Sequence, residues 1–412
     1  MRRLCLILAL GLLATACRAG STEPVTAVQR PVATTTTIPV TTTTEPPTTT
    51  TTLPPTPTTV PEQPSADPPP PPPDRSIPAA MMGALVIAEG GADLFFDRTA
   101  DPYVRAHEGL VFPVIERDDE WLQVLDQCND PGWVLFDEVA FSAARRDDSR
   151  VGAGMEFSDA VVVVDPGHGG PNVGAVGPAG LVEKVVNLDI ARRLRDLLRR
   201  PHTVDWESGE IFNGSAIPAA GQVWMTRQEG PEGADIETGL TFRTTLSDSL
   251  NAHALVSIHN NAAPDGPFEG PGSEVYYKVA DLESKRLSGL VVEELRQEFS
   301  AFEAAWVGAD DAGAKVRVGT DGVDLYGILR QSDAPSVIVE GVYISNESEE
   351  ALLGTAEFRQ AYADAVYRAL VRFVTTDEDG SGFVDTEPFT GGLSSGRPAG
   401  TCSVPAQPEA TP

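Results

Sequence analysis

The chain has 412 residues, enough for two or three domains, and its 60 acidic and 30 basic residues give a formal net charge of −30. This balance excludes a protein that holds nucleic acid through a basic surface. It also excludes docking on an anionic surface by bulk charge, so an anionic polymer has to be held by specific contacts or by a tether.

Residues 1–17 have the features of an export signal. Arg2 and Arg3 precede the apolar run LCLILALGLLATA, which is too short for a typical spanning helix. The ATAC sequence that follows resembles the lipobox of bacterial lipoproteins, so we expect lipid on Cys17 and attachment to the outer face of the cytoplasmic membrane. Cleavage and secretion without lipid is the alternative. Either route predicts an extracytoplasmic protein of the cell envelope.

Residues 18–80 are rich in Thr and Pro, with runs such as TTTTEPPTTTTT. A segment of this composition cannot bury a core, and its prolines favour extended polyproline II. We predict a disordered stalk that holds the folded part away from the membrane. A passive disordered tail is the alternative.

Residues 82–143 contain short strand patterns separated by Gly, Asp and Asn turns, namely GALVIA, LFFD, LVFPVIER, EWLQVLD and GWVLFDEVAF. Their order resembles bacterial SH3-like wall-associated domains, with Trp121 and Trp133 as the matching aromatic residues. The resemblance implies a small all-β domain that binds wall peptide. Alternatively, both tryptophans belong to its core.

After a polar linker over 144–158, residues 159–375 alternate strand and helix patterns. We therefore predict an α/β fold with a mixed, largely parallel sheet flanked by helices. The expected strands are VVVVD, GQVWMTR, ALVSIHNN, GSEVYYK and APSVIVEGVYIS. The expected helices are 181–200, 241–254, 281–305 and 357–374, with an irregular insertion over 201–221.

Residues 376–412 are predicted to form a flexible acidic tail. The tail begins at Asp377 like a calcium loop, but Pro388 stands where a bidentate Glu is needed, so we do not expect bound calcium. Outside the signal and Cys17, the chain keeps two cysteines, Cys128 and Cys402. Sequence alone leaves open whether they form a disulfide or stay free thiols.

Two histidines end strands in the α/β region, His168 after VVVVDPG and His259 in ALVSIHNN. Ligands gather at the carboxyl ends of such strands, so a shared metal ion is expected there. Zinc with an exchangeable position takes three protein ligands, and Glu183, at the start of the next helix, is the third candidate. Asp165 is expected to orient His168 without binding the metal.

The remaining histidines are not expected to bind this metal. His253 is too far from His259 along a strand and is predicted at a helix end or on the surface. His202 is predicted to be exposed in the irregular insertion, and His107 belongs to the β region.

Glu340 is an ionisable residue at the end of the apolar strand SVIVE. Burial raises the pKa of a carboxyl group, which suits a general base that accepts a proton from water. The alternative is a structural carboxylate paired with an arginine such as Arg330 or Arg227. The residues by themselves do not decide between these.

The motifs of residues 160–372, taken together, resemble the zinc-dependent N-acetylmuramoyl-L-alanine amidases of the amidase type 3 class. The matching segments are VVVVDPGHGGPNVGAVGPAGLVEKVVNLDIARRL, VWMTR, FRTTLSDSLNAHALVSIHNNAA, GSEVYY and LRQSDAPSVIVEGVYISNESEEALL. The resemblance implies His168, Glu183 and His259 as Zn²⁺ ligands and Glu340 as the catalytic carboxylate.

The same resemblance implies substrate-binding roles for Asn260 and Arg243, with a structural role as the alternative for Arg243 and for Arg227. The chain departs from the family at Glu340-Gly341-Val342-Tyr343, where Glu-x-Gly-Phe is usual. Its insertion after the first helix is also long.

The function predicted by the resemblance is zinc-dependent hydrolysis of the amide between N-acetylmuramic acid and L-alanine in peptidoglycan. Peptidoglycan is then the partner, and no activator protein can be identified. Two alternatives stay open: a non-catalytic wall-binding or activator protein on the same scaffold, and a zinc peptidase acting within the stem peptide.

Overall fold

The computed structural model describes residues 82–145, 150–228, 236–263, 266–390 and 402–407. The predictions for residues 1–17 and 18–80, including lipid on Cys17, lie outside these ranges. Within them, no helix combines the length and the apolarity needed to cross a membrane.

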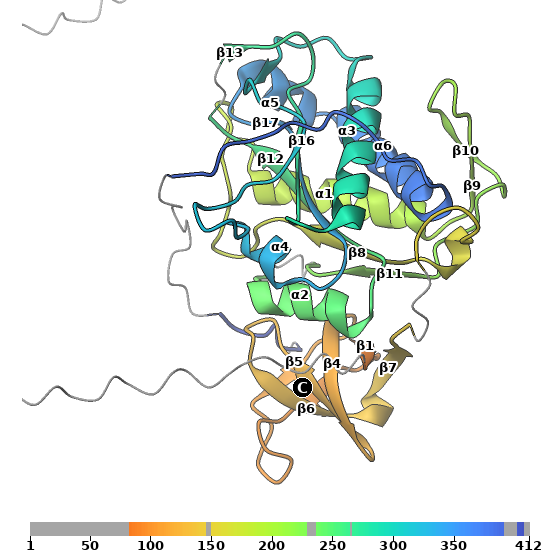
Figure 1. The fold of residues 1–412 in the computed structure, drawn as a ribbon. Coiled ribbons are helices and arrows are strands. Elements are labelled where there is room, and N and C mark those ends of the chain that lie inside the picture. The colour runs from red at the N-terminus through yellow and green to blue at the C-terminus, as the bar shows by residue number, and fades with distance from the viewer. Residues whose placement is uncertain (1–81, 146–149, 229–235, 264–265, 391–401, 408–412) are drawn as a thin grey trace, which may run out of the picture. The chain divides into compact units, whose positions relative to one another are not determined.

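Residues 83–143, called the β module below, form an antiparallel five-stranded sheet in the order β6-β5-β4-β1-β7, with a small β2–β3 hairpin beside it (Figure 1). Alternating apolar residues such as Leu85, Phe112 and Val124 are fully buried in it. The strands are β1 Gly83–Ile87, β2 Ala92–Leu94, β3 Val104–Ala106, β4 Val111–Asp118, β5 Trp121–Leu125, β6 Pro131–Leu135 and β7 Val139–Ala143, with a 3₁₀ turn at Phe136–Glu138.

The following residues form an α/β domain around a six-stranded sheet in the order β11-β8-β12-β17-β14-β16. The first four strands in that order are parallel, whereas β14 runs antiparallel to β17. The predicted mixed, mostly parallel sheet is confirmed. Its strands are β8 Val161–Pro166, β11 Gln222–Met225, β12 Ala254–Asn261, β14 Glu274–Tyr277, β16 Ala314–Lys315 and β17 Ser336–Tyr343.

Helices cover both faces of this sheet (Figure 1). Val162 and Val164 of β8 pack with α1, α3 and α6, while Val161 and Val163 face α2 on the other side. The helices are α1 Glu183–Leu198, α2 Leu240–Ser249, α3 Leu282–Phe299, α4 Gly327–Gln331, α5 Glu347–Leu353 and α6 Ala356–Thr375. The remaining short elements are a 3₁₀ turn Phe157–Asp159 and the strands β9 His202–Val204, β10 Ile211–Asn213, β13 Gly266–Pro267 and β15 Val307–Gly308.

The β module and the α/β domain share one cluster of buried side chains. Phe112 of the β module belongs to the same cluster as Phe242 and Leu246 of α2 and Val163 of β8. Figure 1 shows α2 lying between the β module and the main sheet. The two parts are therefore packed together at α2, although a polar linker joins them in sequence.

Two histidines outside the metal site differ from their predictions. The insertion expected to be irregular contains the β9–β10 hairpin, and His202 in it is buried, with Nε2 3.1 Å from the carbonyl of Leu197. His253, predicted at a helix end or on the surface, lies between α2 and β12 and is buried, and its Nδ1 accepts a hydrogen bond from the Val161 amide at 2.9 Å. His202 adds a contact to the Leu197 carbonyl, which already accepts the Arg200 amide, whereas His253 accepts a buried backbone amide.

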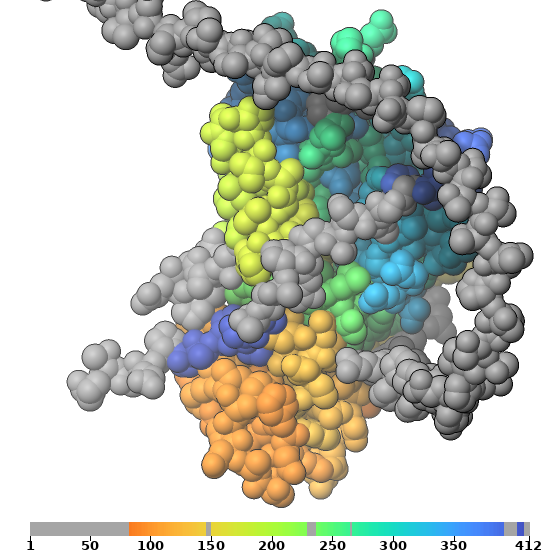
Figure 2. All heavy atoms as spheres, turned by 90° about the vertical axis from the view of Figure 1, so that its left-hand side faces the viewer, coloured from red at the N-terminus to blue at the C-terminus, as the bar shows by residue number. Residues whose placement is uncertain are grey.

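The residues after α6 lie against the α/β domain and then on the β module. Phe383 bridges to Ala314 and Phe389 to Gly319. Cys402 forms a disulfide with Cys128. Residues 402–407, dark blue in Figure 2, lie on the orange β module, where the backbone of Ala406 pairs with that of Ala106.

Candidate metal centre

The turn that follows β8 presents His168 to the carboxyl edge of the sheet. His168 has a positive φ of 64°, an uncommon backbone conformation for a residue other than glycine. Its Nδ1 lies 3.0 Å from Oδ1 of Asn172, which leaves Nε2 facing Glu183. Gly174 is required beside it, because a Cβ there would lie 2.4 Å from Oε2 of Glu183, and its φ is +73°.

Glu183 is the first residue of α1 and only 3% exposed. Its Oε2 accepts a hydrogen bond from the Ala175 amide at 2.8 Å. Its Oε1 accepts from Nδ2 of Asn187 at 3.1 Å and from the Asn260 amide at 3.2 Å. The carboxylate is thus held at the point where α1 meets the strand ends.

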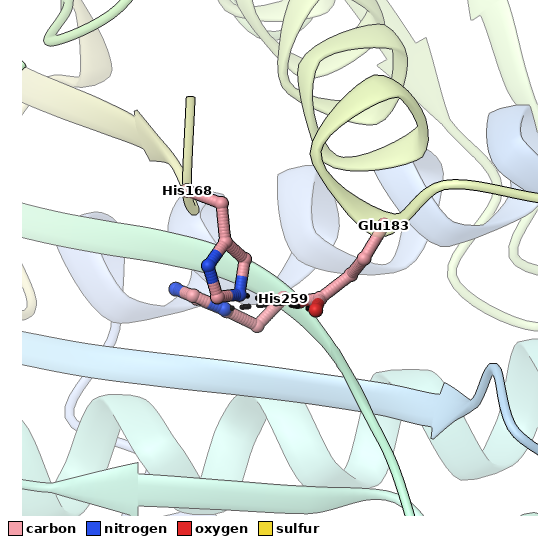
Figure 3. A group of neighbouring side chains, drawn as sticks. All are labelled: His168, Glu183 and His259. Carbon is pink, nitrogen blue, oxygen red and sulfur yellow. Dashed lines mark hydrogen bonds and ion pairs between the residues drawn. The ribbon is translucent and has the colours of Figure 1, made fainter. Parts of the chain in front are cut away.

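These two residues and His259, from β12, converge as predicted for a metal site (Figure 3). Nε2 of His168 lies 3.0 Å from Oε2 of Glu183, and Nδ1 of His259 lies 3.1 Å from Oε1 of the same carboxylate. The ligand atoms all lie within 4.8 Å of one another. Among the described residues this is the only group of His, Cys, Asp and Glu side chains found close enough to hold a metal ion.

The donor set fits zinc. Two imidazole nitrogens and one carboxylate are a usual set for a zinc ion that keeps a position open for exchange. Burial by itself raises the pKa of Glu183, but hydrogen bonds from His168 and His259 outweigh it and hold the pKa well below its ordinary value. Glu183 is therefore ionised, as a ligand must be.

Glu340 lies beside this group on the neighbouring strand, since β17 pairs Glu340 with His259. Burial, followed by the charges of Glu183 and Glu274, raises the pKa of Glu340 well above its ordinary value, and Arg317 opposes the rise. Its Oε2 has no hydrogen-bond partner among the described residues. The side chain is half-buried and its Oε2 is buried, and a carboxyl group in such a setting is suited to general acid–base work.

The alternative partners considered for Glu340 are engaged elsewhere. Nη2 of Arg227 donates to the carbonyls of Gly167 and Lys184, at 3.2 and 2.8 Å. Nη1 of Arg330 donates to the carbonyl of Asp324 at 2.6 Å. Neither arginine is therefore seen to be the partner that the alternative interpretation of Glu340 required, because both donate to backbone oxygens.

Asp165 does not contact the ring of His168; Asn172 does. Asp165 is buried and accepts hydrogen bonds from Thr226, from Ser257 at 2.5 Å and from Arg243 at 2.5 Å. Burial raises the pKa of Asp165, but Arg243 and the two hydroxyls outweigh it, so the net shift is downward. Its influence on His168 runs through Arg243.

Arg243 and Asn260 make hydrogen bonds within the protein. Besides binding Asp165, Arg243 donates to the carbonyls of Pro166 and His168, at 2.9 and 2.6 Å. Asn260 is only 2% exposed, and its Nδ2 donates to Asn187 at 2.9 Å. Both side chains hold the loops that carry the ligands, and Arg243 also lines the cavity beside them, so their substrate-binding roles stay predictions.

Two cavities flank the centre. One, of about 280 Å³, is lined by His168, His259, Thr238 and Tyr326, among others. The other, of about 350 Å³, is lined by residues that the sequence analysis did not single out, including Glu274, Lys315 and Arg317. The signal for Glu274 was available, since it is a carboxylate in the apolar strand GSEVYYK, as Glu340 is in its own strand.

Comparison with known proteins finds relatives of the α/β domain. A family model described as N-acetylmuramoyl-L-alanine amidase matches residues 162–207 and 216–372. The germination-specific N-acetylmuramoyl-L-alanine amidase of Bacillus subtilis (strain 168) is 27% identical over 227 residues, covering 55% of this chain and 84% of the relative. The amidase AmiA of Escherichia coli (strain K12) is 29% identical over 227 residues, covering 52% of this chain and 75% of the relative. The solved structure of the amidase AmiC2 of Nostoc punctiforme is 27% identical, with a TM-score of 0.38, covering 54% of this chain and 98% of that one.

Proposed function

Since residues 162–372 form a domain of the N-acetylmuramoyl-L-alanine amidase family, we propose that this chain uses zinc at His168, Glu183 and His259 to hydrolyse the amide between N-acetylmuramic acid and L-alanine in peptidoglycan. The observation that carries the zinc assignment is the convergence of two imidazoles and a buried carboxylate beside Glu340.

Zinc bound there would supply Lewis acidity toward the amide carbonyl. Glu340 accepts a proton from the attacking water and returns one to the leaving nitrogen, a task that its burial favours. Asn172 fixes the ring of His168, and the backbone amides of Ala175 and Asn260 fix Glu183. The protein thereby holds its charged groups in place before substrate arrives.

The regions before the α/β domain have supporting roles in this proposal. The protein works outside the cytoplasm, anchored by lipid at Cys17, and residues 18–80 give it reach into the wall. The Cys128–Cys402 disulfide supports this location, because disulfides persist in oxidising compartments. The β module, as an SH3-like domain, adds contacts to the wall.

The test is a digestion of purified peptidoglycan with the full chain, with and without a chelator, beside Glu340→Gln. We expect release of intact stem peptides that begin with L-alanine. We expect the chelator to abolish this release and the substitution to lower its rate by roughly 10³-fold. A new amino terminus inside the stem peptide would replace this proposal with a zinc peptidase. No bound zinc and no released peptide would leave a non-catalytic wall-binding protein.

A further inference from the structure

The first turn of α2 lacks a cap of its own. The residue before the helix is Gly239, which has no side chain to accept the free amides of the first turn. Oδ1 of Asn129, in the β module, accepts the amide of Phe242 at 2.8 Å. The Gly239 amide in turn donates to the carbonyl of Gln127 at 2.7 Å. The β module thus does for α2 what a capping residue normally does within one segment.

The β module approaches the start of α2 closely. A Cβ on Gly239 would lie 2.1 Å from Nδ2 of Asn129, nearer than real contacts allow. Glycine is therefore needed at this position for the approach of the capping side chain, although its φ of −67° suits any residue.

The loop that carries Asn129 is itself held in place. Oδ1 of Asp126 accepts the amides of Cys128 and Asp130, each at 2.9 Å, and its Oδ2 accepts the hydroxyl of Tyr103 at 3.0 Å. Cys128 is also bound to Cys402. The capping oxygen is therefore fixed by the fold of the β module and does not depend on α2 for its position.

From α2 the contacts continue to the metal centre. Arg243 follows Phe242 directly and donates to the carbonyl of His168 at 2.6 Å and to Asp165 at 2.5 Å. Its Nε also donates to the carbonyl of Thr238 at 3.2 Å. The start of α2 and the loop bearing His168 are thus tied by one guanidinium, and Thr238 and Gly239 line the cavity beside the ligands.

We propose that Asn129 is a positioning residue for the metal centre: by capping α2 from the β module, it fixes Arg243 and through it the loop that presents His168. This inference rests on the proposed zinc site. The β module then helps to position the metal ligands, in addition to any contact it makes with the wall.

The test measures metal binding by the full chain. Zn²⁺ affinity is obtained by competition with a chromophoric chelator, and the visible spectrum of bound Co²⁺ reports the geometry of the ligands. Groups that orient metal ligands typically change affinity 10- to 100-fold when removed, and we expect Asn129→Ala to weaken Zn²⁺ binding about 10-fold and to change the Co²⁺ spectrum. Asn129→Asp keeps the accepting oxygen and should retain both properties.

The matched control removes a cap at the other edge of the sheet. Oδ1 of Asp281 accepts the Ser284 amide at 2.6 Å at the start of α3, beside a cavity that includes His253. Asp281→Ala should lower thermal stability as Asn129→Ala does, yet leave the Zn²⁺ affinity and the Co²⁺ spectrum unchanged. Gly239→Ala, which displaces Asn129, should also weaken Zn²⁺ binding. If Asn129→Ala does not fold, Gly239→Ala serves as the test of the inference in its place.

Unchanged affinity and spectrum in Asn129→Ala would overturn the inference, since capping would then serve stability alone. Equal losses in Asn129→Ala and Asp281→Ala would overturn it too. If the unaltered chain binds no Zn²⁺, the proposed function fails, and that result differs from both of these.

Discussion

Glu340 and Glu274 stand directly opposite each other on β17 and β14. Like charges in this arrangement repel, so each carboxylate needs compensation. Glu274 receives it from Lys315 at 3.0 Å and from the hydroxyls of Tyr276 and Tyr343. Among the described residues Glu340 has no comparable partners, and burial and the neighbouring carboxylates outweigh the charge of Arg317 in setting its pKa. Of the two, Glu340 is the one suited to proton transfer.

Replacing Glu340 by Gln should lower the rate of stem-peptide release by roughly 10³-fold, because general acid–base catalysis typically contributes 10²- to 10⁴-fold. The zinc content should stay that of the unaltered protein, since Glu340 is not among the three ligands. Peptide release and zinc content measured on one preparation check this. Loss of zinc in the variant would contradict the separation of roles.

Asp248 provides a pH-dependent prediction away from the site. Burial first, and then the charge of Asp333, raise its pKa to about 6, against 3.8 for the free group. The folded state therefore binds this proton more tightly than the unfolded state, so ionised Asp248 lowers stability above about pH 6 and has no such effect below pH 3.8.

Asp248→Asn should thus stabilise the protein by about 2–3 kcal/mol at pH 7–8 and by little near pH 4. The amide oxygen can still accept the Asp333 amide, which lies 2.9 Å from Oδ1 of Asp248. Denaturant unfolding across this pH range measures the difference. A gain that does not change with pH would mean that the charge of Asp248 is not its cause.

The residues of the metal centre were predictable where topology alone places them. His168 and His259 end parallel strands and Glu183 begins a helix, and such positions meet at one edge of a sheet. Asn172 and Arg317 were not predictable in the same way. Their roles depend on the conformations of a turn and of a loop. These conformations leave no periodic pattern in the sequence.

At the scale of elements, α3 and α6 are joined by buried charges. Arg368 of α6 is only 1% exposed and binds Glu294 at 2.6 Å and Glu298 at 2.7 Å. It also donates to the carbonyl of Gly209 at 2.7 Å, which ties the β9–β10 hairpin to the two helices. One guanidinium therefore connects three elements.

Arg368→Ala should lower the free energy of unfolding by about 3–5 kcal/mol, because it leaves Glu294 buried without one of its cations. Arg195→Ala is the control. Arg195 pairs with Asp196, whose side chain is 50% exposed, and such pairs contribute about 1 kcal/mol or less. Urea unfolding of both variants provides the comparison, and similar losses would show that burial of the pair is not what matters.

The longer helices were predicted because their apolar periodicity is regular, although those expected over 241–254 and 281–305 end earlier, at Ser249 and Phe299. Residues 201–221 were wrongly expected to be irregular, because each strand of the β9–β10 hairpin has only three residues. Such a strand is too short for an alternating pattern to stand out from the Gly and Pro around it. The position of the hairpin is set instead by backbone pairing between His202 and Ile217.

At the scale of the molecule, the β module packs against the α/β domain through a shared cluster of buried side chains. The short strands over 82–143 follow the predicted pattern, but the sequence also predicted a polar linker between the two parts. The sequence of a linker does not predict whether the apolar faces of the two segments that it joins pack against each other. Phe112 and Phe242, which share a buried cluster, lie on strands and helices whose patterns are equally consistent with separate cores.

Cys402→Ser should lower the free energy of unfolding by about 2–5 kcal/mol, because the disulfide restricts the unfolded chain. A reducing agent should lower the stability of the unaltered protein by the same amount and leave the variant unchanged. Thermal unfolding with and without reductant measures both. An unaltered protein that is insensitive to reductant while its bridge is reduced would contradict this.

The bridge joins residues 274 positions apart, so the backbone between Cys128 and Cys402 forms a covalent ring. All four residues proposed for catalysis lie within this ring. A single break in the backbone anywhere inside it opens the ring without releasing a fragment, because the bridge still joins the two pieces. In surroundings that contain proteases, a molecule nicked once keeps its whole site in one covalent piece until the bridge is reduced.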